Sequence, residues 1–203
     1  MGTPLDTAGE VVPPAFFDRA VLTVAPDLLG RVIAHTTCEG VVAVRLTEVE
    51  AYDGERDPGS HAYRGPTPRN AVMFGPPGHL YVYFTYGMHW CANAVCGEEG
   101  EGVAILLRAL RPVAGVDEMW ARRPAAKRER DLCSGPARLC QALGLDGTHD
   151  GDDVVTGGGG TTIVEGDVAP PTEVVCTTRV GITAAVNEPW RWYVAGDPNV
   201  SRR

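Results

Sequence analysis

Residues 46–93 read LTEVEAYDGERDPGSHAYRGPTPRNAVMFGPPGHLYVYFTYGMHWCAN, and this stretch decides how the rest of the chain is interpreted. It contains five of the six tyrosines and three of the five histidines. Positions 58–97 contain no Asp or Glu, although the whole chain has 26 acidic residues. A surface without negative charge suits an anionic partner, and nucleic acid is the first hypothesis for that partner.

The charges outside this stretch fall into blocks. Residues 104–140 carry eight basic and four acidic groups, whereas residues 1–57 carry four basic and ten acidic groups. The net charge of −8 argues against a uniformly basic nucleic-acid binder, but a bipolar molecule stays open. Chance clustering on solvated faces is the simpler explanation for the basic block taken alone.

Length and composition indicate an ordinary globular domain. The chain has 203 residues, of which 44% are hydrophobic and 22% are charged. It lacks a run long enough for a transmembrane span and lacks the pattern of a signal peptide. We therefore expect an intracellular protein without membrane contact, cytoplasmic in a bacterium or nuclear in a eukaryote. Its six cysteines are then expected to be reduced thiols.

Apolar periodicity and turn residues predict a mixture of strands and short helices. Strands are predicted at residues 31–37, 41–52, 79–85, 90–96, 103–110, 161–165, 174–180 and 191–195. Helices are predicted at residues 14–20, 24–29, 113–122 and 136–143. We expect residues 1–15 to be frayed and residues 16–203 to form a single domain. Residues 53–77 and the acidic, glycine-rich residues 146–160 are predicted to be loops.

Strand 41–52 places two carboxylates on a face that otherwise reads as apolar. Side chains two residues apart share a face, so Leu46, Glu48, Glu50 and Tyr52 are predicted to point the same way. Arg108 shows the same anomaly on a predicted strand that is apolar on both sides, and it shares a face with Leu106 and Leu110. Solvated carboxylates, a buried ion pair and a carboxylate held ready as a base are the alternatives.

The hairpin predicted around residues 79–96 carries large side chains at its tip. Tyr86 and Met88 flank Gly87 at the turn, where core residues seldom lie. Such side chains suggest a wedge that enters a DNA base stack. The alternative is that Tyr86 packs on a neighbouring loop.

These segments resemble the alkyladenine (3-methyladenine) DNA glycosylases. The similarity spans about residues 41–201 and includes TPRN, YVYFTYGM, ILLRAL, LCSGPARLCQALG and PWRWYV. It implies an α+β fold, with one compact domain, a curved antiparallel β-sheet flanked by helices and a protruding β-hairpin. It also implies a monomer that flips alkylated or deaminated purines out of double-stranded DNA and hydrolyses the glycosidic bond. No cofactor and no metal are expected.

The resemblance also implies roles for individual residues. Glu50 would be the general base for the attacking water, with Arg108 and the backbone near Val180 helping to hold that water. The aromatic walls of the base pocket would be Tyr52, His61 and Tyr83. Asn93 would line the pocket where the amino group of guanine would clash. Tyr86 would fill the gap left in the duplex, with Met88 beside it.

Ser134 and Arg138 are candidates for a phosphate contact. They precede and follow the predicted start of helix 136–143, and a helix N-terminus beside an arginine suits a phosphate. An ordinary capped helix with a surface arginine is the alternative.

Two other readings of the chain remain open. A non-catalytic binder of damaged DNA would keep the wedge without needing Glu50. A metal-dependent hydrolase would use His61, His79 or His89, although no HExxH spacing occurs. Lys127 is the only lysine and lies in a run of arginines far from the pocket residues, so we expect hydrolysis by water and not by an amine nucleophile.

Overall fold

A computed structural model of the chain describes residues 9–85, 87–166 and 170–201. The helices are α1 (Pro14–Phe17), α2 (Val21–Asp27), α3 (Val116–Arg122), α4 (Arg130–Cys133) and α5 (Pro136–Leu143). The strands are β1 (Val32–Thr37), β2 (Gly40–Asp53), β3 (Leu80–Thr85), β4 (His89–Cys96), β5 (Val103–Ala114), β6 (Thr161–Val164), β7 (Val174–Thr177) and β8 (Arg191–Val194). Three short 3-10 helices are η1 (Gly54–Arg56), η2 (Ala71–Phe74) and η3 (Gly147–His149).

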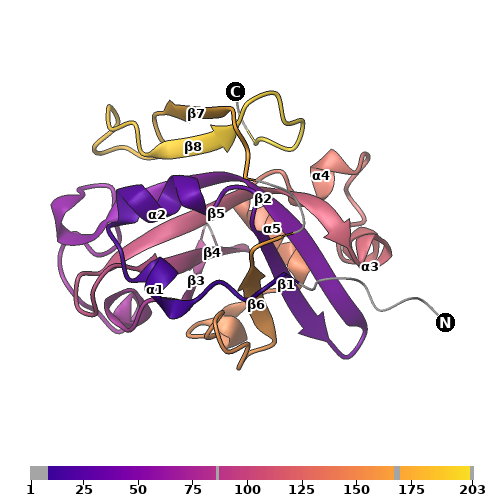
Figure 1. Cartoon of the computed structure of the whole chain (residues 1–203), viewed down its shortest axis with the longest axis horizontal. Helices are drawn as coiled ribbons and strands as arrows, with labels where there is room; N and C mark the ends of the chain where they lie inside the picture. Colours follow the sequence, from indigo (N-terminus) through magenta and orange to yellow (C-terminus); the bar gives the residue numbers. More distant parts are fainter. Residues whose placement is uncertain (1–8, 86, 167–169, 202–203) are drawn as a thin grey trace.

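The described strands form one antiparallel sheet in the order β3-β4-β5-β2-β1-β6, with β8 added to β2 and β7 added to β8 (Figure 1). Strand β2 is shared between two neighbours on one side. Its first half pairs with β1, and Glu48 to Glu50 pair with β8. The sheet therefore curls around β2, and the predicted α+β fold with a single compact domain and a curved antiparallel sheet is confirmed.

The two faces of the sheet are buried by different partners. On one face, side chains of all five helices pack with Leu80, Ala92 and Leu107 in the main hydrophobic core. On the other face, Tyr81 and Val95 belong to a smaller cluster beside the pocket described below. Alternation along β3 and β4 thus sends one set of side chains to the helices and the other set to the pocket.

Two β-bulges reverse the alternation where the carboxylates lie. Leu46 pairs with Leu110, but the next paired residues are Glu48 with Ala109, so Thr47 is an extra residue on β2. A second shift leaves Arg108 as an extra residue on β5. Each inserted residue moves the following side chains to the opposite face.

The predicted sharing of a face by Leu46 with Glu48 and Glu50 is therefore wrong. Leu46 lies in the main core, whereas both carboxylates contact Arg108 on the other side. The predicted sharing by Arg108 and Leu110 is wrong for the same reason, because Leu110 also lies in the main core. The buried ion pair, one of the alternatives for these carboxylates, is present, and Arg108 pairs with both of them.

The acidic loop at residues 146–160 seals the open edge of β3. Asp150 Oδ1 accepts a hydrogen bond from the Val82 amide at 2.8 Å, and the Leu80 amide donates to the Asp152 carbonyl at 2.8 Å. Trp90 packs over Gly147, where an added Cβ would lie 2.6 Å from the indole ring. The loop thus satisfies edge groups that would otherwise be free to pair with another strand.

Several predicted boundaries differ from the structure. Strand β5 continues through Ala114 and α3 begins at Val116, because Gly115 adopts φ 66° and its Cβ position lies 2.6 Å from the Val41 carbonyl. Within the segment expected to be frayed, Val11 bridges to Val164 and Val12 is fully buried. All six cysteines are free thiols. None of the described helices is both long and apolar enough to cross a membrane.

Candidate active site

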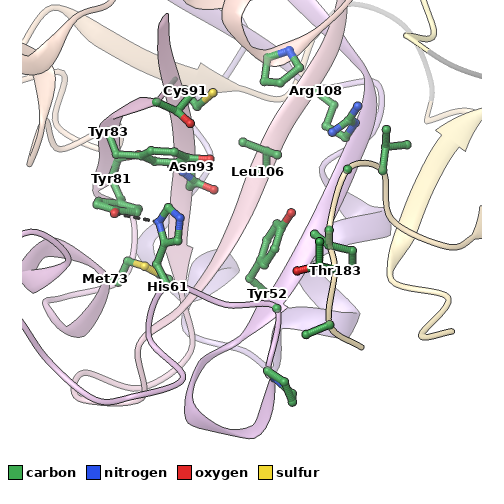
Figure 2. A pocket seen from close by; sticks show the side chains of 18 residues that line it. Tyr52, His61, Met73, Tyr81, Tyr83, Cys91, Asn93, Leu106, Arg108 and Thr183 are labelled. Atoms are coloured by element: carbon green, nitrogen blue, oxygen red, sulfur yellow. Dashed lines mark hydrogen bonds between the residues drawn. The ribbon is translucent and has the colours of Figure 1, made fainter. Parts of the chain in front are cut away.

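A cavity of about 390 Å³ opens on the face of the sheet opposite the helices. Figure 2 shows His61 and Tyr83 on one side of it and Tyr52 and Thr183 on the other. Strands β2, β3, β4 and β5 supply eight of the lining residues, and residues 180–184, which follow β7, close one wall. The lining side chains named as candidates from the sequence are Tyr52, His61, Tyr83, Asn93, Arg108 and Val180.

Aromatic rings form an ordered wall of the cavity. Tyr81 and Tyr83 stack with their centroids 5.3 Å apart, and the His61 ring meets Tyr83 edge-on at 4.6 Å. His61 Nδ1 also lies 3.1 Å from the Tyr81 hydroxyl. Burial and the positive charge of Arg69 lower the pKa of His61, so its imidazole is favoured in the neutral form. Flat apolar faces held this way can receive a planar aromatic ligand.

Glu50 lies directly behind this cavity and is fully buried. Its Oε1 accepts a hydrogen bond from the Val180 amide at 2.7 Å, and its Oε2 accepts one from the Tyr52 hydroxyl at 3.0 Å. Arg108 Nη1 donates to the same Oε2 at 3.3 Å. Burial raises the pKa of Glu50 above its ordinary value, although Arg108 and the two hydrogen bonds oppose the shift.

Glu48 is equally buried but lies among more donors. Its Oε1 accepts from Arg108 Nε at 2.9 Å, from Arg191 Nε at 2.7 Å and from the Ser201 hydroxyl at 3.0 Å. The Ser201 amide donates to Oε2 at 2.7 Å. Although burial alone would raise the pKa of Glu48, the two arginines and Ser201 together lower it. Glu48 is therefore a stable anion, whereas Glu50 is the carboxylate better able to take a proton.

Asn93 projects into the cavity from β4, and its amide nitrogen donates to the Tyr81 carbonyl at 3.1 Å. This bond fixes the orientation of the side chain.

Burial raises the pKa of Tyr81 to about 12 and raises the pKa of Tyr83 and Tyr52 further. The tyrosine hydroxyls therefore remain protonated donors at neutral pH.

The tip of the β3–β4 hairpin is exposed on both sides of the turn. Met88 is 69% exposed and Phe84 is 44% exposed. Gly87 adopts φ 68°, and an added Cβ there would meet nothing within 4 Å. Tyr86, the other predicted wedge residue, lies outside the described residues.

Ser134 and Arg138 lie at the start of α5, close to Pro136 at the rim of the cavity. The N-cap residue of α5 is Gly135, and the helix has no side-chain cap hydrogen bond. Arg138 is exposed, and its Nη1 donates to the Ser134 carbonyl at 3.3 Å. Among the described residues it forms no ion pair with a carboxylate.

Sequence reasoning missed two charged residues beside the cavity. Arg179 and Asp57 form a bidentate ion pair with both side chains fully buried. They are separated by 122 residues and lie in irregular segments, so no periodicity marks them. Tyr81 was expected only as part of a half-buried strand, and it is fully buried next to the pocket.

No group of three or more His, Cys, Asp or Glu side chains in the described ranges is arranged to hold a metal ion. His61, His79 and His89 make separate contacts. His79 Nδ1 lies 3.1 Å from the Pro76 carbonyl, and His89 is exposed on β4.

Comparison with known proteins gives a consistent result. Residues 15–198 match the family model described as methylpurine-DNA glycosylase. A relative from Burkholderia lata is 53% identical over 193 residues, covering 95% of this chain and 92% of its own. One from Streptomyces avermitilis is 52% identical, covering 92% and 88%. One from Carboxydothermus hydrogenoformans is 45% identical, covering 95% and 100%. Each carries the name "Putative 3-methyladenine DNA glycosylase".

Proposed function

Because the chain belongs to the methylpurine-DNA glycosylase family, we propose that it flips alkylated or deaminated purines out of duplex DNA and hydrolyses their glycosidic bonds. It is a 3-methyladenine DNA glycosylase, and DNA is its partner. The observation that carries the proposal is Glu50, a buried carboxylate with a raised pKa directly behind an aromatic pocket.

Base flipping is supported by the shape and chemistry of the cavity. A stacked base hides its sugar from attack, so an enzyme must extrude the nucleotide before it can act. A purine entering the cavity would meet Tyr83 and His61 on one side and Tyr52 on the other. Asn93, which donates a hydrogen bond to the Tyr81 carbonyl, would reject a purine with an amino group at that edge. Such discrimination would favour 3-methyladenine and hypoxanthine over guanine.

The chemistry would require one water molecule and one base. Glu50 would accept a proton from the water, and its charge would stabilise the positive charge that develops on the sugar. Arg108 and the Val180 amide, both bonded to Glu50, would orient that water. A pKa above the ordinary value makes Glu50 a stronger base than an exposed glutamate.

The outer contacts would hold the duplex open. Met88 is exposed at the hairpin tip and would enter the minor groove beside Tyr86, which would fill the gap left by the flipped base. Ser134 and Arg138 would contact a phosphate at the start of α5. The neighbouring Arg123 supports this role, because burial and then the charge of Arg138 lower its pKa, so these two positive groups would gain from an anion.

Hydrolysis by water should leave an intact strand with an abasic site. Lys127 is exposed, and it does not line the described cavity. We infer a monofunctional enzyme that acts as a monomer and without a cofactor.

The deciding experiment measures free base release from a duplex with one methylated purine, in the presence of a chelator. We expect release of free base, an intact strand and no protein–DNA adduct when borohydride is added. Binding without release would indicate a non-catalytic damage binder, and release abolished by the chelator would indicate a metal-dependent hydrolase. A trapped adduct would contradict the water mechanism.

A further inference from the structure

Arg179 is a buried cation to which the proposed reaction assigns no role. It lies between β7 and β8, and its side chain has no exposed surface. Its Nη2 donates to Asp57 Oδ1 at 2.8 Å, and its Nη1 donates to Asp57 Oδ2 and, at 3.0 Å, to the Ala51 carbonyl. The guanidinium also lies over the Trp190 ring, 5.0 Å from its centroid.

Three residues beside Glu50 are linked to the Arg179 guanidinium: Ala51 and Tyr52 contact it, and Val180 follows Arg179 in the chain. Val180, whose amide bonds to Glu50, is the next residue in the chain. The Tyr52 ring, whose hydroxyl bonds to Glu50, lies 4.7 Å from the guanidinium carbon. Ala51, whose carbonyl accepts from Arg179, separates Glu50 from Tyr52 on β2. A shift of Arg179 would therefore move both neutral donors of Glu50 together.

Asp57 connects the same ion pair to a second segment that lines the cavity. Its Oδ1 accepts from the Gly59 amide at 2.8 Å, and its Oδ2 accepts from the Asp53 amide at 3.4 Å. Pro58 and Gly59 both line the cavity. A Cβ on Gly59 would lie 3.0 Å from Arg179 Nη2 and 3.3 Å from the carbonyl of Ala184, which is also a lining residue. The pair thus sets the spacing between two cavity walls.

We propose that Asp57 and Arg179 are positioning residues for base release, holding Glu50 and the cavity walls in the reactive geometry. The inference rests on the proposed function. Burying two charges carries a large desolvation penalty, and well-packed apolar residues often stabilise a fold as much or more. The bidentate fork, the carbonyl contact and the ring contact instead fix one geometry, which only an arginine provides.

Arg179→Lys tests the pair because lysine keeps the charge but loses the planar fork. We expect the single-turnover rate of base release at saturating duplex to fall about tenfold to 100-fold, as for other small displacements of reacting groups. Affinity for the duplex should change less than the rate. The midpoint of the pH–rate profile should rise, because the Val180 and Tyr52 donors that lower the pKa of Glu50 would be weakened.

Asp197→Asn is the matched control. Asp197 is also buried and paired with an arginine, Arg111, but neither residue contacts Glu50 in the described structure. This variant should lose stability without a change in rate per folded molecule or in the pH midpoint. An equal rate loss in both variants would mean that Arg179 is merely structural.

If Arg179→Lys does not fold, Gly59→Ala provides a second test, because it crowds the pair without removing a charge. It should also slow release and shift the pH midpoint. A wild-type rate and midpoint in either folded variant would overturn the positioning role while base release by the wild type continued. Absence of release in the wild type would instead overturn the proposed function.

Discussion

Glu48 and Glu50 lie two residues apart on β2, are both fully buried and both bond to Arg108, yet their surroundings differ. Glu48 has two arginines and both donors of Ser201, and its pKa is lowered. Glu50 shares one arginine and has two neutral donors at the edge of the cavity, and its pKa is raised. Environments that move the pKa values of two neighbouring carboxylates apart commonly give the two groups different roles.

The difference teaches that burial alone does not identify a base. Burial is the largest influence on both pKa values and acts in the same direction on both. What separates the two carboxylates is how many cations and donors compensate for burial. Glu48 accepts a hydrogen bond from Ser201, whereas Glu50 accepts one from Tyr52, which lines the cavity. Each prediction below perturbs one side of this comparison.

The largest effect is expected from Glu50→Gln. The amide has the same shape but cannot accept the proton of the attacking water, so base release should fall about 10²–10⁴-fold. Duplex binding and folding should be retained. Because the pKa of Glu50 is raised in the folded state, its ionised form is disfavoured there, and the neutral variant should be about as stable as the wild type at pH 7. Single-turnover release and urea unfolding measure the two quantities.

Glu48→Gln should show the reverse pattern. Removing this anion leaves Arg108 and Arg191 with less compensation in a buried site, which should lower the free energy of unfolding by about 3–5 kcal/mol. The loss should shrink as the pH falls, because a group with a lowered folded pKa contributes stability above its unfolded pKa and loses it as pH falls through the folded pKa. Abolished release with unchanged stability would exchange the roles assigned to the two carboxylates.

A smaller effect is expected from Tyr52→Phe, which removes one neutral donor from Glu50. A hydrogen bond to a charged group contributes about 1.5–3 kcal/mol, so its loss should raise the pKa of Glu50 further. The midpoint of the pH–rate profile reports the shift. Ser201→Ala, which removes a hydroxyl donor from Glu48, is the control and should leave that midpoint unchanged.

The smallest effect is expected from Arg138→Ala, which leaves both carboxylates untouched. If Arg138 contacts a phosphate, the log–log slope of DNA binding against salt should become shallower by about one unit. The pH midpoint should stay at the wild-type value. An unchanged slope would leave Arg138 as an ordinary surface residue on α5.

Local patterns predicted the elements of the site well. Alternation in residues 80–85 indicated a half-buried strand, and the arginine at position 108 of an apolar strand pattern suggested a buried ion pair as one alternative, which is present. The bulges at Thr47 and Arg108 could not be predicted, because each depends on how two distant strands pair. The prediction that Glu48 and Glu50 lie on the same face of β2 as Leu46 was therefore wrong, because it assumed a strand register without bulges.

Long-range contacts account for the rest of what the sequence did not reveal. The Asp57–Arg179 pair joins two irregular segments, and its partners are apparent only when those segments meet. The acidic loop was unassigned because its function in the fold depends on backbone groups of β3 that pattern analysis does not consider. Side chains that bond to backbone groups far away leave no periodic trace.

The most direct test of the account is the pH–rate profile of single-turnover base release, measured on one methylated duplex for the wild type, Glu50→Gln and Glu48→Gln. If Glu50 is the base, its ionised form is required, so the wild-type rate should fall as the pH drops through a midpoint above the ordinary value for a glutamate. Folded Glu48→Gln should keep this limb, and Glu50→Gln should lose it, with a low and flat residual rate. A limb that persists in Glu50→Gln and disappears in Glu48→Gln would contradict the assignment of Glu50 as the base.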